Sequence, residues 1–568
     1  MEKNLLFAFI SSTIILAVYW YFFPPGEKTP SKPPVAIEAE ASPTTDAPQA
    51  GVVPLEPSQA ENPLAINPAV PAAPTTDNQA LASQEIKIDS GNFSLIFDTK
   101  AASLKKLYLN NYNYALNSPQ VLYKKLWDML MSNPPPKKYD PKRKVNMIGE
   151  AAWQNDKILA LSFNPGDENL VYSASEYDQQ NNSITFEATS PLGYSITKQF
   201  RLKPDDYQLE LLISLKNNTD SAIAIYPQLF FGSGNEMIEA YYQPANKVVM
   251  SLIDDDYEKY KIKEKFSLEQ YQWLAIADTY FVNGLMPSSN DWQADFEPTL
   301  ELLAGKSYTH PLLTLKQTPR NLLAGAGYEE SFKFYAGPKD LTWLEKFEPT
   351  FDETLDLFLN IIARPMLLLL RWFNSYVANW GIAIMLLTVV VRIIIFPLAF
   401  SGMRAMKNMS KLNPRIQILR KMHAKDKQKL NTEIMQLYRK NKANPVGGCL
   451  PLLAQFPIFI ALYWALLPAV EIRHQPLFLW LNDLSNYDPF MILPIIMGAT
   501  MFLQQKISPP PANLEPLQQK MMQFLPLILV VFFVNFPAGL VLYWVTSNVI
   551  TIFQQLVFNR IKVKEVIE

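Results

Sequence analysis

The chain has 568 residues, enough for more than one domain, and its 51 Lys and Arg nearly balance its 53 Asp and Glu. The resulting net charge of −2 is no nucleic-acid signature, so we expect no direct nucleic-acid partner and look at the distribution of charge instead. The one cysteine, Cys449, excludes an intrachain disulfide. The three histidines lie far apart without ligand spacing, so we expect no metal and no cofactor.

The N-terminal region reads as a membrane anchor followed by a tether. Residues 1–23 contain an apolar run that ends in aromatic residues and two prolines, where a signal peptide would offer a small-residue cleavage site. This pattern predicts an uncleaved signal-anchor helix with its short N-terminus in the cytoplasm. Residues 24–82 are rich in Pro, Ala and Thr with almost no aromatics, which predicts a disordered linker.

Residues 83–350 alternate between apolar and polar positions in short runs separated by turn signals. The runs that read as strands include 93–97, 104–109, 159–163, 184–188, 194–202 and 209–215. Strands at this spacing predict a large all-β sandwich, which lies outside the cytoplasmic membrane because it follows a signal-anchor. Its aromatic strands are compatible with a carbohydrate-type cleft, but no carboxylate pair stands in a recognisable motif, so we expect a scaffold or docking domain.

Residues 351–568 predict a helical membrane domain. The segment at about 353–375 is amphipathic, with Arg364 and Arg371 on one stripe, and favours a helix lying in the outer interface. The next segment, about 378–400, is apolar enough to span a bilayer yet carries Arg392 well inside the run. An arginine at mid-membrane costs about 2.5–3.5 kcal/mol on insertion scales, so it needs a partner or a wet cavity. We expect a water-accessible, functional Arg392; the alternative is an arginine that snorkels or closes a structural pair.

Residues 401–446 are strongly basic, which places this segment in the cytoplasm. Two apolar helical patterns separated by a turn at 424–426 predict an antiparallel helical hairpin. Its methionines suit varied apolar partners, so a substrate-recruiting surface is one interpretation and a solvated charged face is the other. The recruiting surface would include Met403, Met406, Arg420, Met422, Lys425 and Lys427.

Four further apolar segments, at about 447–467, 489–503, 521–536 and 538–558, complete six predicted spans with both termini in the cytoplasm. The segments 489–503 and 521–536 are short for a hydrocarbon core of about 30 Å, so they would thin the bilayer around them.

Polar residues recur at membrane depth on several of these helices. Tyr543, Ser547 and Thr551 follow one another at helical spacing on the last span, and Gln455 lies in the third. Thr388 shares a helix face with Arg392. Single groups of this kind often serve only as contacts between helices. No Asp or Glu occurs in the predicted spans, so water or a transient acidic partner from outside is the simplest way to satisfy Arg392.

Several stretches resemble the YidC/Oxa/Alb family of membrane protein insertases. They are WGIAIMLLTVVVR followed by FPL, NPVGGCLPLLAQFPIFIALYWAL, LFLWLNDLSNYDPFMILPIIMGATMFLQQK and FPAGLVLYWVTSNVITIFQQ. The signal-anchor, tether and outer β-domain are similar to the Gram-negative form. The resemblance implies a periplasmic β-supersandwich and a groove open to cytoplasm and lipid but closed toward the periplasm. It maps the family's groove arginine to Arg392 and its aromatic groove contact to Tyr543.

The expected protein is thus not an enzyme but an inner-membrane insertase and chaperone for nascent integral membrane proteins. The resemblance implies work alone or beside the Sec translocon and its accessory subunits, and the basic hairpin suggests contact with the ribosome or signal recognition pathway. A polytopic transporter with a periplasmic binding domain is the alternative, although no repeat relates the two halves. An intramembrane protease would need a Ser–His pair, an Asp pair or HExxH in the spans, and none occurs.

Overall fold

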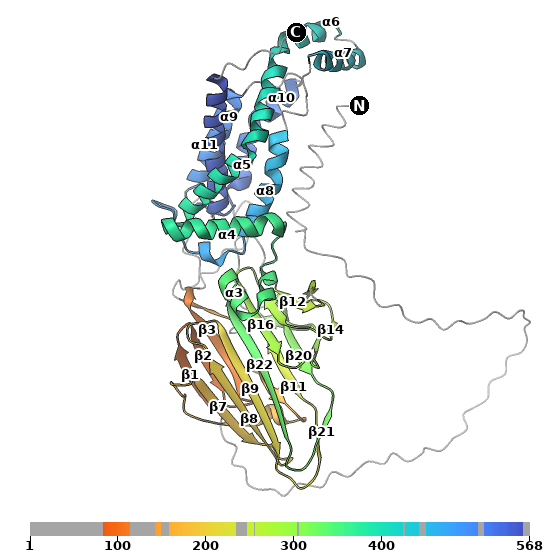
Figure 1. Cartoon of the computed structure of the whole chain (residues 1–568), viewed down its shortest axis with the longest axis vertical. Coiled ribbons are helices and arrows are strands. Elements are labelled where there is room, and N and C mark those ends of the chain that lie inside the picture. Colours follow the sequence, from red (N-terminus) through yellow and green to blue (C-terminus); the bar gives the residue numbers. More distant parts are fainter. Residues whose placement is uncertain are drawn as a thin grey trace, which may run out of the picture. The chain divides into compact units, whose positions relative to one another are not determined.

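The structure, a computed structural model, describes residues 83–113, 143–148, 158–233, 247–254, 256–303, 306–423, 426–441, 450–508 and 516–560. Residues 83–568 form one compact unit, which holds a β-rich region followed in the chain by a helical region (Figure 1). The predicted signal-anchor at 1–23 and the linker at 24–82 lie outside the described residues.

The β-rich region contains twenty-two named strands. In chain order they are β1 Glu85–Ser90, β2 Phe93–Asp98, β3 Ser103–Asn113, β4 Lys144–Asn146, β5 Leu161–Ser162, β6 Ser173–Ala174, β7 Ser183–Thr189, β8 Tyr194–Leu202, β9 Gln208–Asn217, β10 Ile223–Ile225, β11 Gln228–Gly232, β12 Val248–Ile253, β13 Asp256–Lys261, β14 Phe266–Leu268, β15 Leu274–Ala277, β16 Phe281–Pro287, β17 Gln293–Phe296, β18 Thr299–Leu303, β19 Lys306–His310, β20 Leu312–Lys316, β21 Arg320–Leu322 and β22 Gly327–Pro338. One 3₁₀ turn, η1 Asp167–Asn169, lies among them.

These strands build a two-layer sandwich. One layer is a nine-stranded antiparallel sheet of order β13-β12-β15-β16-β22-β9-β8-β7-β6. The other layer consists of a four-stranded sheet, β1-β2-β3-β4, and a five-stranded sheet, β14-β17-β20-β11-β5. Ring contacts join the layers, because Phe97 of β2 packs on Phe200 of β8 at 4.7 Å and Phe231 of β11 packs on Phe334 of β22 at 6.2 Å. The prediction of a large all-β sandwich is confirmed.

The alternating sequence pattern explains this layering. Along β8 the burial alternates strictly, with Tyr194, Ile196 and Phe200 inside. Side chains of successive strand residues point to opposite faces, so one face of β8 supplies the core. The six strand segments predicted from the sequence all fall on or overlap β2, β3, β5, β7, β8 and β9. A turn lies at 164–166, between β5 and η1, with Gly166 at φ 102°.

One charged side chain lies inside this core. Lys198 of β8 is fully buried, and its Nζ donates to the backbone oxygens of Ala101 (3.0 Å), Ala102 (2.7 Å) and Leu159 (2.8 Å). All three partners have a positive φ, which L-residues rarely adopt. Burial lowers the pKa of Lys198 to about 7. The lysine therefore holds two strained loops by satisfying three carbonyls that have left water.

We expect Lys198→Met to destabilise the β-domain by about 3 kcal/mol, because each buried acceptor left without a donor costs about 1–3 kcal/mol. Hydrogen exchange of β8 in the full-length protein in detergent measures this loss. The matched control is Lys216→Met on neighbouring β9, an exposed site where we expect a change within about 0.5 kcal/mol. Equal protection in the two variants would contradict the role given to Lys198.

The helical region follows the last strand. Its elements are α3 Leu341–Phe347, η2 Pro349–Leu355, α4 Asn360–Val377, α5 Trp380–Lys411, α6 Asn413–Met422, α7 Lys427–Lys440, α8 Leu450–Leu466, η3 Val470–Ile472, α9 Ile492–Ile507, α10 Pro516–Phe533 and α11 Ala538–Arg560.

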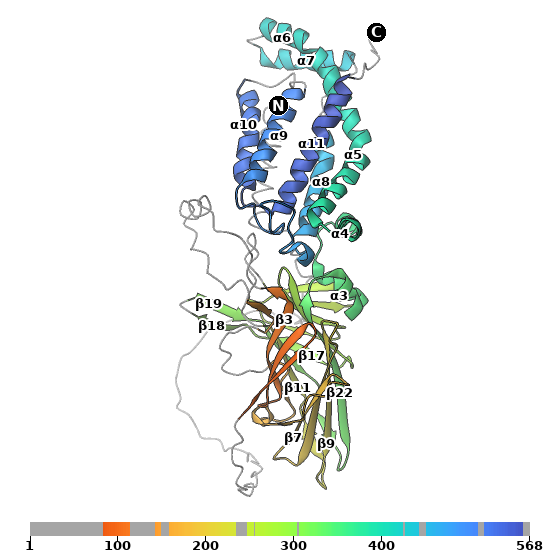
Figure 2. The same cartoon turned by 90° about the vertical axis from the view of Figure 1, so that its left-hand side faces the viewer.

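The amphipathic helix differs in extent from the expectation of 353–375. The chain first forms η2 and then breaks where Asp356 and Leu359 adopt left-handed backbone at φ 55° and 56°, so α4 begins only at Asn360. Figures 1 and 2 both show α4 lying across the ends of α5 and α8, as a helix in an interface plane would. Its two arginines pair with carboxylates: Arg364 with Glu345 and Asp352, and Arg371 with Asp340 and Glu471.

Helices α5, α8, α9, α10 and α11 pack side by side around a second hydrophobic core (Figure 2). Members from four helices include Leu387 of α5, Leu462 of α8, Met497 of α9 and Leu540 of α11. By length and composition α5 and α11 are long and apolar enough to cross a membrane, and 455–466, 492–507 and 521–533 are shorter apolar helices. The helical region predicted for 351–568 is therefore present, while the count of six spans remains a prediction.

The chain between α5 and α8 also differs in detail from its prediction. α5 continues to Lys411, so Met403 and Met406 belong to its last turns and not to the first hairpin helix. α6 and α7 then share a small core of their own, made of Leu412, Ile416, Ile434 and Tyr438. Asp426 caps α7 by accepting from the backbone N–H of Lys429 at 3.0 Å.

Candidate functional site

Three helices meet at the guanidinium of Arg392. Its Nε donates to Ser547 Oγ of α11 at 2.8 Å, and its Nη2 donates to the same oxygen and to Gln455 Oε1 of α8 at 3.2 Å. Gln455 Nε2 closes the triangle on Ser547 Oγ at 3.3 Å. We call Arg392, Gln455 and Ser547 the Arg392 network. All three residues are among those that the sequence pattern selected.

The partners in this network are neutral. Arg392 is 8% exposed and Ser547 is fully buried, whereas Gln455 is half-buried. No carboxylate pairs with Arg392 among the residues that the structure describes. Hydroxyl and amide oxygens satisfy the N–H groups of a guanidinium but leave its charge uncancelled. The side chain of Arg392 is largely packed and is held by uncharged partners, and the expectation that water reaches it stays a prediction.

The other predicted groove residues lie near this network without joining its hydrogen bonds. The hydroxyl of Thr388 donates to its own helix at Ile384 O (2.7 Å), and that of Thr551 donates to Ser547 O (2.8 Å). Tyr543 is 1% exposed and belongs to the hydrophobic core, one helical turn from Ser547. A Ser or Thr hydroxyl that donates to its own helix is buried without leaving an unsatisfied polar group. Thr388 and Thr551 can therefore lie in an apolar bundle at little cost in stability.

Sequence reasoning singled out no bond between α9 and α11. Asn548 Nδ2 of α11 donates to Thr500 Oγ1 of α9 at 3.1 Å. The hydroxyl of Thr500 also donates within its own helix, to Met497 O at 2.8 Å, so nothing in its apolar segment marks it as a partner of α11. This bond fixes α9 to α11 at the depth of the Arg392 network.

The residues predicted for the hairpin surface are spread over several elements. Met403 is buried at the end of α5, Met406 and Arg420 are half-buried, and Met422 is 68% exposed at the end of α6. Lys427 opens α7, and Lys425 lies outside the described residues. The structure therefore leaves Met422 as the exposed apolar residue of this set.

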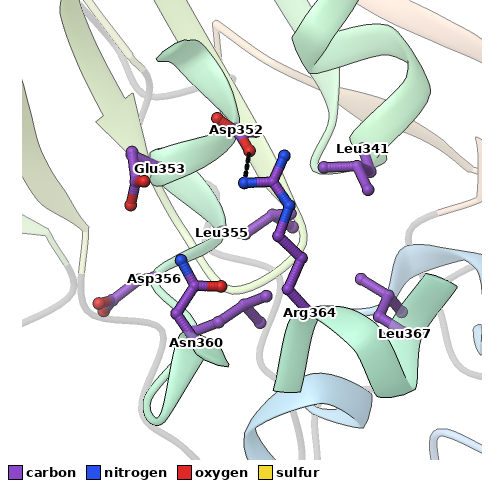
Figure 3. A pocket seen from close by; sticks show the side chains of 9 residues that line it. Leu341, Asp352, Glu353, Leu355, Asp356, Asn360, Arg364 and Leu367 are labelled. Atoms are coloured by element: carbon purple, nitrogen blue, oxygen red, sulfur yellow. Dashed lines mark ion pairs between the residues drawn. The ribbon is translucent and has the colours of Figure 1, made fainter. Parts of the chain in front are cut away.

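A separate pocket lies where η2 leads into α4 (Figure 3). Arg364 points at Asp352 there, with 2.7 Å between Nη1 and Oδ2, and Leu341 and Leu367 lie beside the pair. Burial raises the pKa of Asp352, and the charge of Arg364 opposes this rise. Because Arg364 is already paired with Asp352, we assign no ligand to this pocket. The ion pair attaches α4 to η2. Within the described residues no group of three or more His, Cys, Asp or Glu could hold a metal ion.

Comparison with known proteins divides the chain in the same way. Residues 85–369 match the family model of the YidC periplasmic domain, and residues 372–565 match that of the 60Kd inner membrane protein. A membrane protein insertase YidC of Geotalea daltonii is 31% identical over 572 residues, covering 99% of both chains.

The chain belongs to the YidC family of membrane protein insertases. The YidC insertase of Actinobacillus pleuropneumoniae serotype 3 is 38% identical over 66% of this chain and 69% of its own. A crystal structure of an active YidC insertase aligns over 83% of this chain and 92% of its own, with 18% identity and a TM-score of 0.36. As a YidC, the chain is an inner-membrane insertase with a periplasmic domain and is not an enzyme. The insertase interpretation therefore replaces the transporter alternative.

We expect Ser547→Ala to destabilise the protein by about 1.5–3 kcal/mol, since a hydrogen bond to a charged group is worth about that much. The measurement is the melting temperature of the full-length protein in detergent. Thr546→Val is the control, because that hydroxyl bonds only within α11, to Leu542 O at 2.8 Å. Melting of Ser547→Ala at the wild-type temperature would show that the Arg392 network contributes nothing to stability.

Proposed function

We propose that this protein inserts nascent membrane proteins through a hydrophilic groove around Arg392, open to the cytoplasm and to lipid. The single observation that supports this is the buried guanidinium of Arg392 on α5, held by uncharged partners on α8 and α11. Thr388, Tyr543 and Thr551 belong to the same proposed groove.

The mechanism follows from the energy of charges in hydrocarbon. A client must carry a polar and often acidic outer flank across the membrane, where isolated charges are very costly. An arginine whose Nε and Nη2 bond to neutral groups keeps its charge uncancelled, so it attracts such a flank without first having to break an ion pair. The client's apolar segment then partitions sideways into lipid, which supplies the driving force.

Short helices assist this step in the proposal. α9 has 16 residues and α10 has 18, of which the apolar part is 521–533. At about 1.5 Å per residue α9 spans about 24 Å, less than a hydrocarbon core of about 30 Å. A bilayer thinned around α9 and α10 would shorten the dry distance beyond Arg392.

The wider arrangement belongs to the same proposal. It comprises six spans with both termini in the cytoplasm, a cytoplasmic α6–α7 hairpin, and action alone or beside the Sec translocon and its accessory subunits. The hairpin is proposed to recruit clients that the ribosome or the signal recognition pathway delivers. Its support is a basic surface combined with exposed Met422 and Ile418.

Charge at Arg392 is the feature to test. We expect Arg392→Lys to keep much of the insertion of a client with an acidic outer flank, and Arg392→Ala to lose it by about tenfold. The assay is protease protection of the client in proteoliposomes. A client with a neutral flank is the control and should depend less on the charge. Equal loss or equal retention in the two variants would count against electrostatic capture.

The hairpin allows a second test. Replacing 413–440 by a short Gly-Ser linker keeps α5 whole and removes a segment with its own small core. We expect client crosslinking to fall severalfold while the melting temperature of the membrane domain changes little. Normal client capture by this deletion would remove the recruitment role.

A further inference from the structure

The chain between α8 and α9, residues 467–491, folds into a compact segment that we call the outer connection. Its own backbone closes it. Leu477 N donates to Leu481 O at 3.0 Å, and Leu484 N donates to Gln475 O at 3.0 Å. Leu477, Leu481 and Leu484 are all buried members of the second hydrophobic core. The outer connection is therefore a packed part of the helical region and not a loose surface loop.

The start of α11 is bonded to the outer connection. Ala538 N donates to Asn486 O at 2.6 Å, and Gly539 N donates to Leu484 O at 2.9 Å. The first N–H groups of a helix have no partner within that helix, so these two carbonyls fix where α11 begins. The approach is close, because a Cβ on Gly539 would lie 3.2 Å from Leu484 O and 3.2 Å from Ile384 Cδ1 of α5.

The start of α5 meets the same segment at Leu477. Asn379 caps α5 by accepting from Ile382 N at 3.0 Å, and its Nδ2 donates to Leu477 O at 2.9 Å. Gly381 lies against the Leu477 side chain, where an added Cβ would be 2.2 Å from Cδ1 and 3.0 Å from both Cβ and Cγ. A methyl group fits there only if α5 or the outer connection moves by about 1 Å, since the site is closely packed.

The two helices that carry Arg392 and Ser547 thus start from one element. Arg392 lies about 20 Å from Asn379 along α5, and Ser547 lies about 14 Å from Ala538 along α11, at about 1.5 Å per residue. A packed helix is stiff enough to transmit a displacement of one end to side chains at this distance. The outer connection therefore determines the depth of both side chains.

The polar stripe of α11 does not by itself choose the partner of Arg392. Tyr543, Ser547 and Thr551 recur every four residues, so a slip of α11 by one turn, about 5.4 Å, would place a neighbouring hydroxyl at the depth of Arg392. A shift of only about 1 Å along the bond from Arg392 Nε to Ser547 Oγ, now 2.8 Å, would take it beyond hydrogen-bonding distance. A contact outside the stripe has to fix the register.

We propose that the outer connection sets the axial register between α5 and α11 and thereby selects Ser547 as the partner of Arg392. This inference rests on the proposed function and adds what places its charge. Gly381 and Leu477 act as positioning residues, since they lie far from the guanidinium and reach it only through α5. A client with an acidic flank then meets the charge at one fixed depth.

Gly381→Ala tests the register, because its methyl group displaces Leu477, and Leu477→Ala in the same chain restores the space. Insertion is measured with the full-length protein in proteoliposomes, using two clients that differ only in an acidic or a neutral outer flank. We expect Gly381→Ala to insert the acidic-flanked client about fivefold more slowly and the neutral-flanked client at nearly the wild-type rate, with recovery in the double variant. Equal slowing of both clients, as a general loss of structure would give, overturns the inference.

A double-mutant cycle measures the register without any client. Ser547→Ala should lower the melting temperature of the wild-type protein but not that of Gly381→Ala, in which the bond from Arg392 to Ser547 is already lost. Residues this far apart are ordinarily independent, so additive losses in the double variant would overturn the inference. Should Gly381→Ala not fold, Asn379→Asp takes its place, because it keeps the cap of α5 and loses only the donor to Leu477 O.

Gly498→Ala is the matched control. Its Cβ would lie 2.3 Å from Val530 Cγ2, a similar clash that involves α9 and α10 and not the outer connection. We expect it to affect the two clients equally, and discrimination as strong as that of Gly381→Ala would overturn the role given to the outer connection. If Arg392→Ala itself treats the two clients alike, the proposed function fails. If Arg392→Ala discriminates between them and Gly381→Ala does not, only the inference about register fails.

Discussion

A buried positive charge with neutral partners is the constraint around which the helical region is built. Nε and Nη2 of Arg392 donate to Ser547 and Gln455, and this requires α5, α8 and α11 to meet at one depth. A carboxylate at either position would bind the guanidinium more tightly and cancel its charge. Neutral acceptors stabilise the arginine in place and leave its field available, which is what the proposed capture of acidic flanks needs.

The surrounding helices divide into a fixed and a loosely held part. α4, α5, α8 and α11 contribute most of the second hydrophobic core, and backbone bonds to the outer connection anchor the start of α11. α10 enters that core only at its end, through Phe533. A helix that packs along α9 and enters the core only at Phe533 suits a protein whose clients must leave sideways into lipid.

The β-domain also buries a charged side chain, but it stabilises that charge with a different set of hydrogen-bond acceptors. Lys198 has three carbonyl acceptors for its three N–H groups, all on loop residues with positive φ. Arginines of α4 meet carboxylates instead, since Arg364 and Arg371 lie where water still reaches part of the side chain. The partner of each cation thus follows its environment: carbonyls in the β-core, a hydroxyl and an amide at Arg392, and carboxylates at α4.

The periodicity of the sequence by itself determined where strands and helices form and which polar residues lie at membrane depth. Alternation of period two predicted β8 and β9, and the apolar run around Arg392 predicted the helix that carries it, because local burial patterns record which face leaves water. The resemblance of whole stretches, and not the spacing of residues, indicated the insertase family. The break at Asp356 and Leu359 escaped prediction because no glycine marks those left-handed positions.

Tertiary structure alone decided which polar groups touch. Ser547 lies 155 residues from Arg392 and Gln455 lies 63 residues from it, and nothing local separates them from Thr388 or Thr551, which bond back to their own helices. The ring contacts among Phe459, Phe533 and Trp544 are equally non-local, since these residues come from three different helices. A sequence pattern reports which face of a helix is buried, but the rotation and depth at which helices pack set the partners of each side chain.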